Sequence, residues 1–238
     1  KKNFSFAHFY LRRGRRILPA LFFLLFCCIP LSWFILLPSS YLDLSKSILY
    51  SLGFSSNFYF YFSGLEYGAI YWLLKPLLHT WSLSVEEHYY ILFPILFVLG
   101  FLFLRKRLNI LIIVFLLSSL VFAELFSVKN SNLNFYILPS RAWELLVGSL
   151  LVFIGNKKIL KTSKFHSNIL SVIGLSLILF SFIYFYEATP SPNIKSILPI
   201  IGTLLILVFY RKETIMAKFF NNRLLVGVGL ISYSLYLW

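Results

Sequence analysis

The sequence predicts an all-α fold, a polytopic integral membrane helical bundle with about seven or eight transmembrane segments. Of its 238 residues, 59% are hydrophobic and 13% are charged, and the mean hydropathy is +0.83. This composition is too apolar for a soluble domain of the same length to bury in one core. Long apolar runs alternate with short basic segments, as expected of a membrane protein whose helices need about 20 apolar residues to cross the bilayer.

Seven apolar stretches are predicted to be spans. They lie near residues 17–37, 83–104, 110–127, 140–156, 169–187, 197–210 and 224–238. The last stretch ends within the apolar run "GLISYSLYLW", so we expect the natural protein to continue past Trp238. Residues 41–62 are long enough for an eighth span, but they carry Asp43, Lys46 and a "GFSSN" break in the middle.

The distribution of basic residues predicts the topology. Lysine and arginine outnumber aspartate and glutamate by 22 to 8, and they gather between the predicted spans, at 12–16, 105–107, 157–164 and 211–223. Because basic loops of membrane proteins face the cytoplasm, we expect all four segments on that side. Placement between spans explains the positive charge without a nucleic-acid partner, and we expect none.

An even number of crossings must then separate the first two basic segments. Either residues 41–62 do not fully cross, or they cross and residues 63–82 return through the membrane as irregular chain. Irregular backbone at membrane depth is tolerated only where protein or a wet cavity surrounds it. Both topologies therefore place the stretch "HTWSLS" at a cavity or an interface.

The strongest candidate site lies in "LLHTWSLSVEEHYYILFPILF", residues 77–97, where Glu86 and Glu87 stand beside an apolar run. Ionisable groups at membrane depth are expensive, and they commonly mark function. With His79 nearby, either glutamate could form the carboxylate and base pair that activates a hydroxyl for attack. Trp81 would line a cavity or belong to an interfacial aromatic belt. We predict Glu86, Glu87 and His79 as the catalytic candidates.

A structural interpretation of the same stretch stays open. Ser84 and Glu87 have the S-x-x-E spacing of a capping box, in which Ser84 caps the amides of a helix that starts there and Glu87 reaches back to the cap. The helix dipole also favours acidic residues in a first turn. This interpretation predicts a helix that begins at Ser84.

Two charged pairs are further candidates. Arg13 and Arg16, within "RRGRR", lie three residues apart and hence on one helical face, where they could contact anionic lipid or bind the phosphates of a ligand. Arg141 and Glu144 have the same spacing and can form an ion pair, either structural or part of a site. Gly148 on that helix would allow close helix packing. The sequence holds no metal-ligand motif, so we expect no metal.

Four segments together resemble the bacterial membrane acyltransferase family three, whose members include O-antigen and other surface-polysaccharide acetylases. The segments are "FYLRRGRRILPAL", "KPLLHTWSLSVEEHYYILFP", "LPSRAWELLVGSLL" and "GLISYSLYLW". The resemblance implies transfer of an acyl group, usually acetyl from cytoplasmic acetyl-CoA, to a sugar hydroxyl of an envelope polysaccharide, a lipopolysaccharide or a lipid-linked sugar. It also implies a multi-pass protein of the bacterial inner membrane.

Site residues follow from the resemblance position by position. Arg13 and Arg16 match the family's arginine pair on the acyl-CoA side, and Glu86 and Glu87 match its paired glutamates. The later arginine and glutamate of the family correspond to Arg141 and Glu144. His88 stands where the family commonly has glutamine. The family's first membrane helix, with the histidine usually proposed as catalytic, would precede Lys1, so we expect residues 1–238 to be a partial acyltransferase domain.

Two alternatives compete with an enzyme. A transporter or exporter of a glycan or small anionic substrate would also contain intramembrane acids, a broken helix and aromatic linings. Such transporters often show paired broken helices in two related halves, whereas this sequence shows one broken region. A membrane scaffold with structural ion pairs is the third interpretation. It explains the adjacent glutamates only if their sole role is in the capping box.

Overall fold

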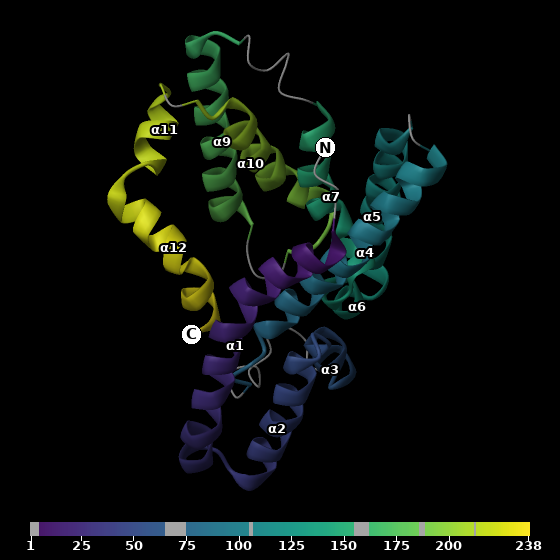
Figure 1. Cartoon of the computed structure of the whole chain (residues 1–238), viewed down its shortest axis with the longest axis vertical. Coiled ribbons are helices and arrows are strands. Elements are labelled where there is room, and N and C mark those ends of the chain that lie inside the picture. The colour runs from purple at the N-terminus through teal and green to yellow at the C-terminus, as the bar shows by residue number, and fades with distance from the viewer. Residues whose placement is uncertain (1–4, 65–74, 105–106, 155–161, 186–188, 212) are drawn as a thin grey trace. The chain divides into compact units, whose positions relative to one another are not determined.

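The computed structural model describes residues 5–64, 75–104, 107–154, 162–185, 189–211 and 213–238. Within these ranges all regular structure is helical and no strand occurs (Figure 1), which confirms the all-α prediction. The chain divides into two compact units, residues 1–96 with 230–238, and residues 97–229.

The first unit begins with α1 (Phe6–Ile35), which is longer than the predicted span. The helix starts early because Ser5 caps it, its hydroxyl accepting a hydrogen bond from the amide of His8 at 3.5 Å. The basic segment 12–16 therefore lies inside α1 rather than ahead of it. As a result, Arg13 and Arg16 are held on one face of a regular helix, as their spacing predicted.

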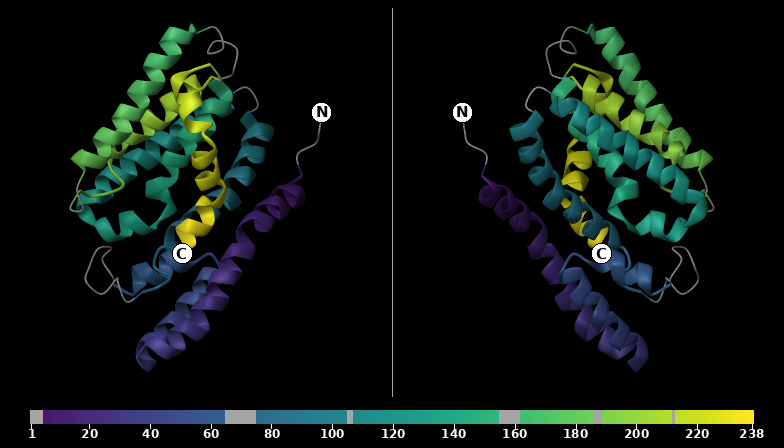
Figure 2. Two further views of the ribbon diagram at one scale, coloured as in Figure 1. Left: turned by 90° about the vertical axis from the view of Figure 1, so that its left-hand side faces the viewer. Right: turned by 90° about the vertical axis from the view of Figure 1, so that its right-hand side faces the viewer.

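The ambiguous stretch 41–62 forms two short helices, α2 (Pro38–Leu52) and α3 (Ser56–Phe62). Pro38 starts α2 directly after α1, so that the two helices lie side by side as a hairpin (Figure 2). The "GFSSN" segment separates α2 from α3 as expected, and Phe54 within it has a φ of 49°. Neither helix alone has the length of a span.

The next helix, α4 (Thr80–Leu104), starts beside the middle of α1. This follows from the core of the unit, in which apolar residues of several elements pack together: Ile17, Leu21, Leu24, Leu25, Leu44, Leu77, Leu83 and Leu237. A helix of the length of α1 extends about 45 Å, and one of the length of α2 about 22 Å. Helix α2 and the beginning of α4 thus each lie beside only part of α1. This arrangement favours the topology in which residues 41–62 do not fully cross.

The end of α12 (Arg223–Leu237) completes the first unit. Its Leu237 belongs to the core of that unit, and the hydroxyl of Tyr233 donates to the carbonyl of Ile17 at 3.2 Å. The final residues of the chain therefore pack against its first helix.

The second unit contains the remaining helices. These are the end of α4, α5 (Leu108–Lys129), α6 (Ser131–Tyr136), α7 (Leu138–Ile154), α9 (Lys164–Tyr184), the 3-10 turn η2 (Ile194–Ser196), α10 (Ile197–Phe209), α11 (Ile215–Phe220) and the start of α12. Helices α9 and α10 pack closely where Gly174 faces Gly202. Gly148 does not make the predicted close contact, because among the described residues nothing lies within 4 Å of a Cβ built there.

Two polar side chains of α5 form hydrogen bonds with backbone groups of neighbouring elements in this unit. The Ser119 hydroxyl of α5 donates to the carbonyl of Pro139 at 2.5 Å and accepts from the amide of Trp143 at 2.9 Å, so it bridges two groups of α7. Glu124, whose partner the sequence does not reveal, accepts from the amide of Ile194 at 2.8 Å. Both contacts fix α5 to neighbouring elements of the same unit.

Among the described residues, four helices are long and apolar enough to cross a membrane: Phe6–Ile35, Thr80–Phe103, Leu108–Lys129 and Lys164–Tyr184. The predicted spans at 140–156, 197–210 and 224–238 are helical but shorter, with 17, 13 and 15 residues. The protein is thus a multi-pass membrane protein, but the expected count of seven or eight spans is not confirmed. Residues 105–106, 157–161 and 212 of the basic segments lie outside the described residues, and the side that these segments face stays a prediction.

Candidate functional site

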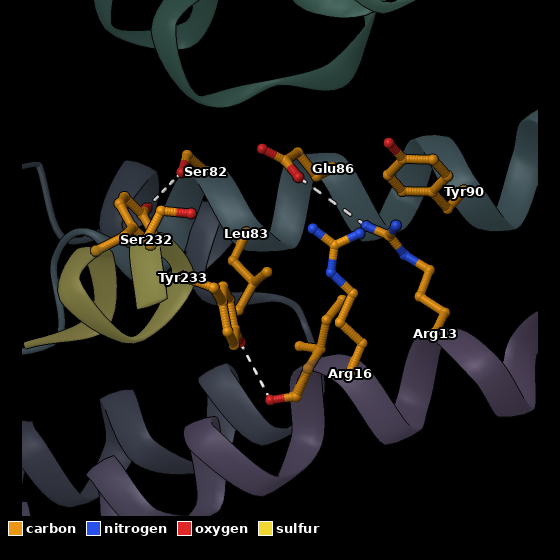
Figure 3. Close-up of a pocket in the computed structure, with 10 residues that line it drawn as sticks. Arg13, Arg16, Ser82, Leu83, Glu86, Tyr90, Ser232 and Tyr233 are labelled. Atoms are coloured by element: carbon orange, nitrogen blue, oxygen red, sulfur yellow. Dashed lines mark hydrogen bonds and ion pairs between the residues drawn. The ribbon is translucent and has the colours of Figure 1, made fainter. Parts of the chain in front are cut away.

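The first unit contains a pocket of about 410 Å³ formed by α1, α4 and the end of α12. Its charged lining residues are Arg13, Arg16 and Glu86. Hydroxyl groups also line the pocket, from Ser82 and Tyr90 of α4 and from Ser232, Tyr233 and Tyr236 of α12, and Ile17 and Leu83 are its apolar lining residues. Figure 3 shows the two arginines of α1 reaching toward α4, where Glu86 and Tyr90 lie.

Two residues of α4, Glu87 and Tyr90, hold the Arg13 side chain in place. Its Nε and Nη2 atoms contact the same oxygen of Glu87, Oε1, at 2.8 and 2.7 Å. The guanidinium carbon lies 3.3 Å from the centre of the Tyr90 ring, a cation–π contact. The side chains of Arg13 and Glu87 are 17% and 11% exposed, so this ion pair joins α1 to α4 in a largely dry environment.

Arg16 differs from Arg13 although both line the pocket. Its side chain is exposed, and within the described part of the chain it has no ion pair or hydrogen bond. The guanidinium therefore keeps all its donors for a ligand. The sequence predicted a pair of equivalent arginines, whereas the structure distinguishes a fixed one from an available one.

Glu86 also differs from its neighbour. Its side chain is 52% exposed and its Oε2 atom lies 4.0 Å from Nη2 of Arg13, at the outer limit of an ion pair. Glu87 is buried beside Arg13, but Glu86 presents its carboxylate to the pocket (Figure 3). Of the two adjacent acids, only Glu86 is placed to meet a molecule in the pocket.

The capping box predicted for this segment is wrong. Helix α4 begins at Thr80 rather than Ser84, so Ser84 and Glu87 lie inside the helix and cannot cap its first turn. The Ser84 hydroxyl instead contacts the hydroxyl of Ser56 at 2.8 Å and accepts from its amide at 3.2 Å. The Glu87 carboxylate forms an ion pair with Arg13.

Ser84 belongs to a buried hydroxyl layer, which we define as Ser51, Ser56, Thr80 and Ser84. Thr80 contacts Ser51 at 2.9 Å and Ser56 at 3.0 Å, and all four residues are at most 2% exposed. The layer joins the end of α2, the start of α3 and the start of α4. Helix ends within a bilayer need such partners because no water is available there.

His79 lies outside the pocket lining, and its side chain contacts α12. The carbonyl of His79 accepts a hydrogen bond from the Tyr236 hydroxyl, and the two rings meet edge to face at 5.5 Å. The imidazole also bonds to the backbone of Leu237, while its buried Nε2 atom has no hydrogen-bond partner. The structure therefore does not join His79 to Glu86 or Glu87 as the expected carboxylate and base pair.

Tyr236 connects His79 to the pocket. Its single hydroxyl proton is donated to His79, so the Ser82 hydroxyl, 2.5 Å away, must be the donor to Tyr236. Ser82 and Tyr236 both line the pocket. No local sequence pattern predicts this contact, because more than 150 residues separate Ser82 from Tyr236.

The other predicted residues lie elsewhere. Trp81 is buried at 7% exposure and does not line the pocket. The ring of His88 lies 5.4 Å from that of Phe58 and bonds to the backbone of Phe54, so it supports the break after α2. Arg141 and Glu144 form the predicted ion pair, at 3.6 Å, but in the second unit. Among the described residues, no cluster of three metal-ligating side chains occurs.

Comparison with known proteins gives the chain a family context. The model of the family described as "Acyltransferase domain" matches residues 1–238. A protein of Haemophilus influenzae with no assigned function is 34% identical over 221 residues, which cover 87% of this chain and 88% of that protein.

Two further relatives carry functional names. A "Putative peptidoglycan O-acetyltransferase" of Bacillus subtilis is 26% identical, with 99% of this chain and 39% of that protein covered. A "Putative O-acetyltransferase" of Staphylococcus aureus is 29% identical, with 97% and 40% covered. The chain thus spans about two fifths of the length of these two relatives. No solved structure matches it.

Proposed function

The chain belongs to the acyltransferase family, and from this premise we propose that it transfers an acetyl group from acetyl-CoA to a sugar hydroxyl of a bacterial envelope glycan. In this reaction the thioester C–S bond breaks, an ester C–O bond forms, and the hydroxyl proton passes to the departing thiolate. The name of the Bacillus subtilis relative supports peptidoglycan as the acceptor, and lipopolysaccharide is the second candidate, from the sequence resemblance. The site of action is the bacterial inner membrane.

The observation that carries the proposal is the contrast between Arg13 and Arg16. A guanidinium with free donors at a pocket is suited to a phosphate, which it can bind through two parallel hydrogen bonds. Coenzyme A carries several phosphates. Arg16 is the phosphate ligand in this proposal, and Arg13 holds α1 against α4 so that Arg16 faces the pocket.

The acidic residues and His79 receive separate roles. Glu86 faces the pocket and orients the catalytic base or stabilises it once it is protonated, as a carboxylate does in a hydrolase triad. Glu87 acts through Arg13. His79 acts through Tyr236, which forms part of the pocket wall. Glu87 and His79 are thus positioning residues rather than groups in contact with the reacting atoms.

One observation favours the transporter alternative. Helices α2 and α3 form a broken segment whose ends meet α4 at the hydroxyl layer, and broken helices with facing ends are typical of transporter substrate sites. Acetyl-CoA consumption separates the two functions, because a transporter needs no thioester.

Binding of acetyl-CoA to the full-length protein in lipid nanodiscs tests the donor site. Arg16→Gln removes one charged hydrogen-bonding group, so the affinity should fall roughly tenfold or more. Arg15→Gln is the matched control, because Arg15 is exposed on the same helix and does not line the pocket. Equal affinities of the two variants would contradict the donor site. Mass spectrometry of the surface glycan from cells with the gene deleted and restored then tests acetyl transfer itself.

A further inference from the structure

A second polar cluster lies in the first unit, away from the arginine pocket. We define this outer cluster as Asp43 of α2, Tyr50 of α2, Tyr59 of α3 and Lys75. Oδ2 of Asp43 forms an ion pair with Lys75, and Oδ1 accepts a hydrogen bond from the Tyr59 hydroxyl. The rings of Tyr50 and Tyr59 stack with centres 4.8 Å apart.

The charged groups of the outer cluster can form more hydrogen bonds than they do. Each carboxylate oxygen can accept two hydrogen bonds and an ammonium group can donate three. Within the described part of the chain, however, one side chain contacts each oxygen of Asp43, and Lys75 has one ion pair. The side chains of Lys75 and Asp43 are 22% and 30% exposed, and Tyr50 is 43% exposed. A ligand can therefore reach both charges and a tyrosine ring together.

The hydroxyl layer separates the outer cluster from the pocket. Ser51 of the layer and Asp43 are on the same helix, and their separation along α2 corresponds to about 12 Å. Asp43 lies toward the α1–α2 hairpin, while Arg13 and Arg16 lie in the opposite half of α1. If the arginine end of α1 faces the cytoplasm, the outer cluster lies toward the other side of the membrane.

A sugar ring matches the chemistry of this cluster. Its C–H face packs on an aromatic ring, and its adjacent hydroxyls can donate to a carboxylate and accept from an ammonium group. We propose that the outer cluster binds an uncharged sugar ring of the acceptor glycan, on the opposite side of the hydroxyl layer from the donor pocket. This inference rests on the proposed function, and it adds the place where the acceptor enters.

A purely structural ion pair is the competing explanation. Asp43 and Lys75 would then only hold α2 to the segment before α4, and their loss would disturb the whole unit, including the arginine pocket. The two explanations differ in what happens to donor binding. An acceptor site can be removed without any change in the affinity for acetyl-CoA.

The test uses the full-length protein in its own cells, with two measurements on each variant. Glycan acetylation is measured by mass spectrometry, and binding of radiolabelled acetyl-CoA is measured in isolated membranes. Asp43→Asn and Tyr50→Leu should each lower glycan acetylation at least tenfold and leave acetyl-CoA affinity within twofold of wild type. Tyr61→Leu, on α3 but outside the outer cluster, is the matched control and should change neither.

Tyr50→Leu keeps the test decisive if Asp43→Asn fails to accumulate, because it leaves the ion pair intact. The inference is overturned if Tyr50→Leu acetylates glycan as well as Tyr61→Leu does, or if acetyl-CoA affinity falls in parallel with acetylation. Failure of the proposed function looks different, since the wild-type protein would then neither bind acetyl-CoA nor acetylate glycan. That result would remove the acceptor site as well.

Discussion

Arg13 and Glu87 form an ion pair in which Nε and Nη2 of the arginine both contact one oxygen of the glutamate, Oε1, at 2.8 and 2.7 Å. The contact joins residues 74 positions apart and ties α1 to α4. Because both side chains are mostly buried, water cannot solvate the charge that remains when its partner is removed. The two residues should therefore behave as one unit under mutation.

The first prediction is that Glu87→Gln destabilises the folded protein by about 2 kcal/mol, because it leaves the Arg13 charge without its partner. Arg13→Met should cost a similar amount. The double variant with Arg13→Met and Glu87→Gln should be more stable than either single variant, since no buried charge remains. Thermal unfolding of the full-length protein in nanodiscs measures all three, and additive losses would contradict the pairing.

The second prediction concerns Glu86, which shares the sequence motif but not the environment. Its side chain is 52% exposed, so Glu86→Gln should leave the unfolding temperature within a degree or two of wild type. Glycan acetylation should nevertheless be lost if the carboxylate orients or stabilises the catalytic base, with a decrease of about 100-fold or more. A Glu86→Gln variant that retains full acetylation would exclude this residue from the reaction.

These two predictions could not be derived from the sequence. The motif presents Glu86 and Glu87 as equals, and the S-x-x-E spacing suggests that Glu87 belongs to a helix start. The actual start at Thr80 is set by packing of Leu77 and by the hydroxyl layer, which are contacts with α1, α2 and α3. Apolar length predicted where the long helices lie, although the expected count of spans is not confirmed. The relative register of the helices depends on contacts between distant segments.

Sequence spacing predicts partners within one helix, but it does not predict partners on distant segments. Arg141 and Glu144 pair as predicted, because a spacing of three within one helix fixes their separation. Glu124, by contrast, bonds to the amide of Ile194. Tyr233 and Tyr236 of α12 bond to the carbonyls of Ile17 and His79, which lie 216 and 157 positions earlier in the chain. Local spacing carries no information about such partners.

The third prediction tests the connection between Tyr236 and His79. Tyr236→Phe removes the hydroxyl that donates to the carbonyl of His79 and accepts from Ser82. Loss of these hydrogen bonds should destabilise the protein by about 1 kcal/mol and weaken acetyl-CoA binding severalfold, because Ser82 and Tyr236 form part of the pocket wall. Tyr61→Phe is the control, since Tyr61 lies on α3 outside the pocket lining. Identical acetyl-CoA affinities in the two variants would separate Tyr236 from the donor pocket.

The fourth prediction compares two glycines that a helical sequence pattern cannot distinguish. A Cβ at Gly174 of α9 would lie 2.6 Å from the carbonyl oxygen of Gly202 and 3.0 Å from Cβ of Leu205, whereas a Cβ at Gly148 of α7 would meet nothing described within 4 Å. Gly174→Ala must force α9 and α10 apart, with a cost of about 1–3 kcal/mol. Gly148→Ala should be neutral or stabilising by up to about 1 kcal/mol, because alanine is the better helix former.

Thermal unfolding of the two glycine variants in parallel measures this difference. Both substitutions add the same methyl group to a helix, so intrinsic helix propensity favours both equally, and only the space around each position differs. A lower unfolding temperature for Gly174→Ala than for Gly148→Ala is the expected result. The reverse order would contradict the close approach of α9 and α10, and with it the packing of the second unit.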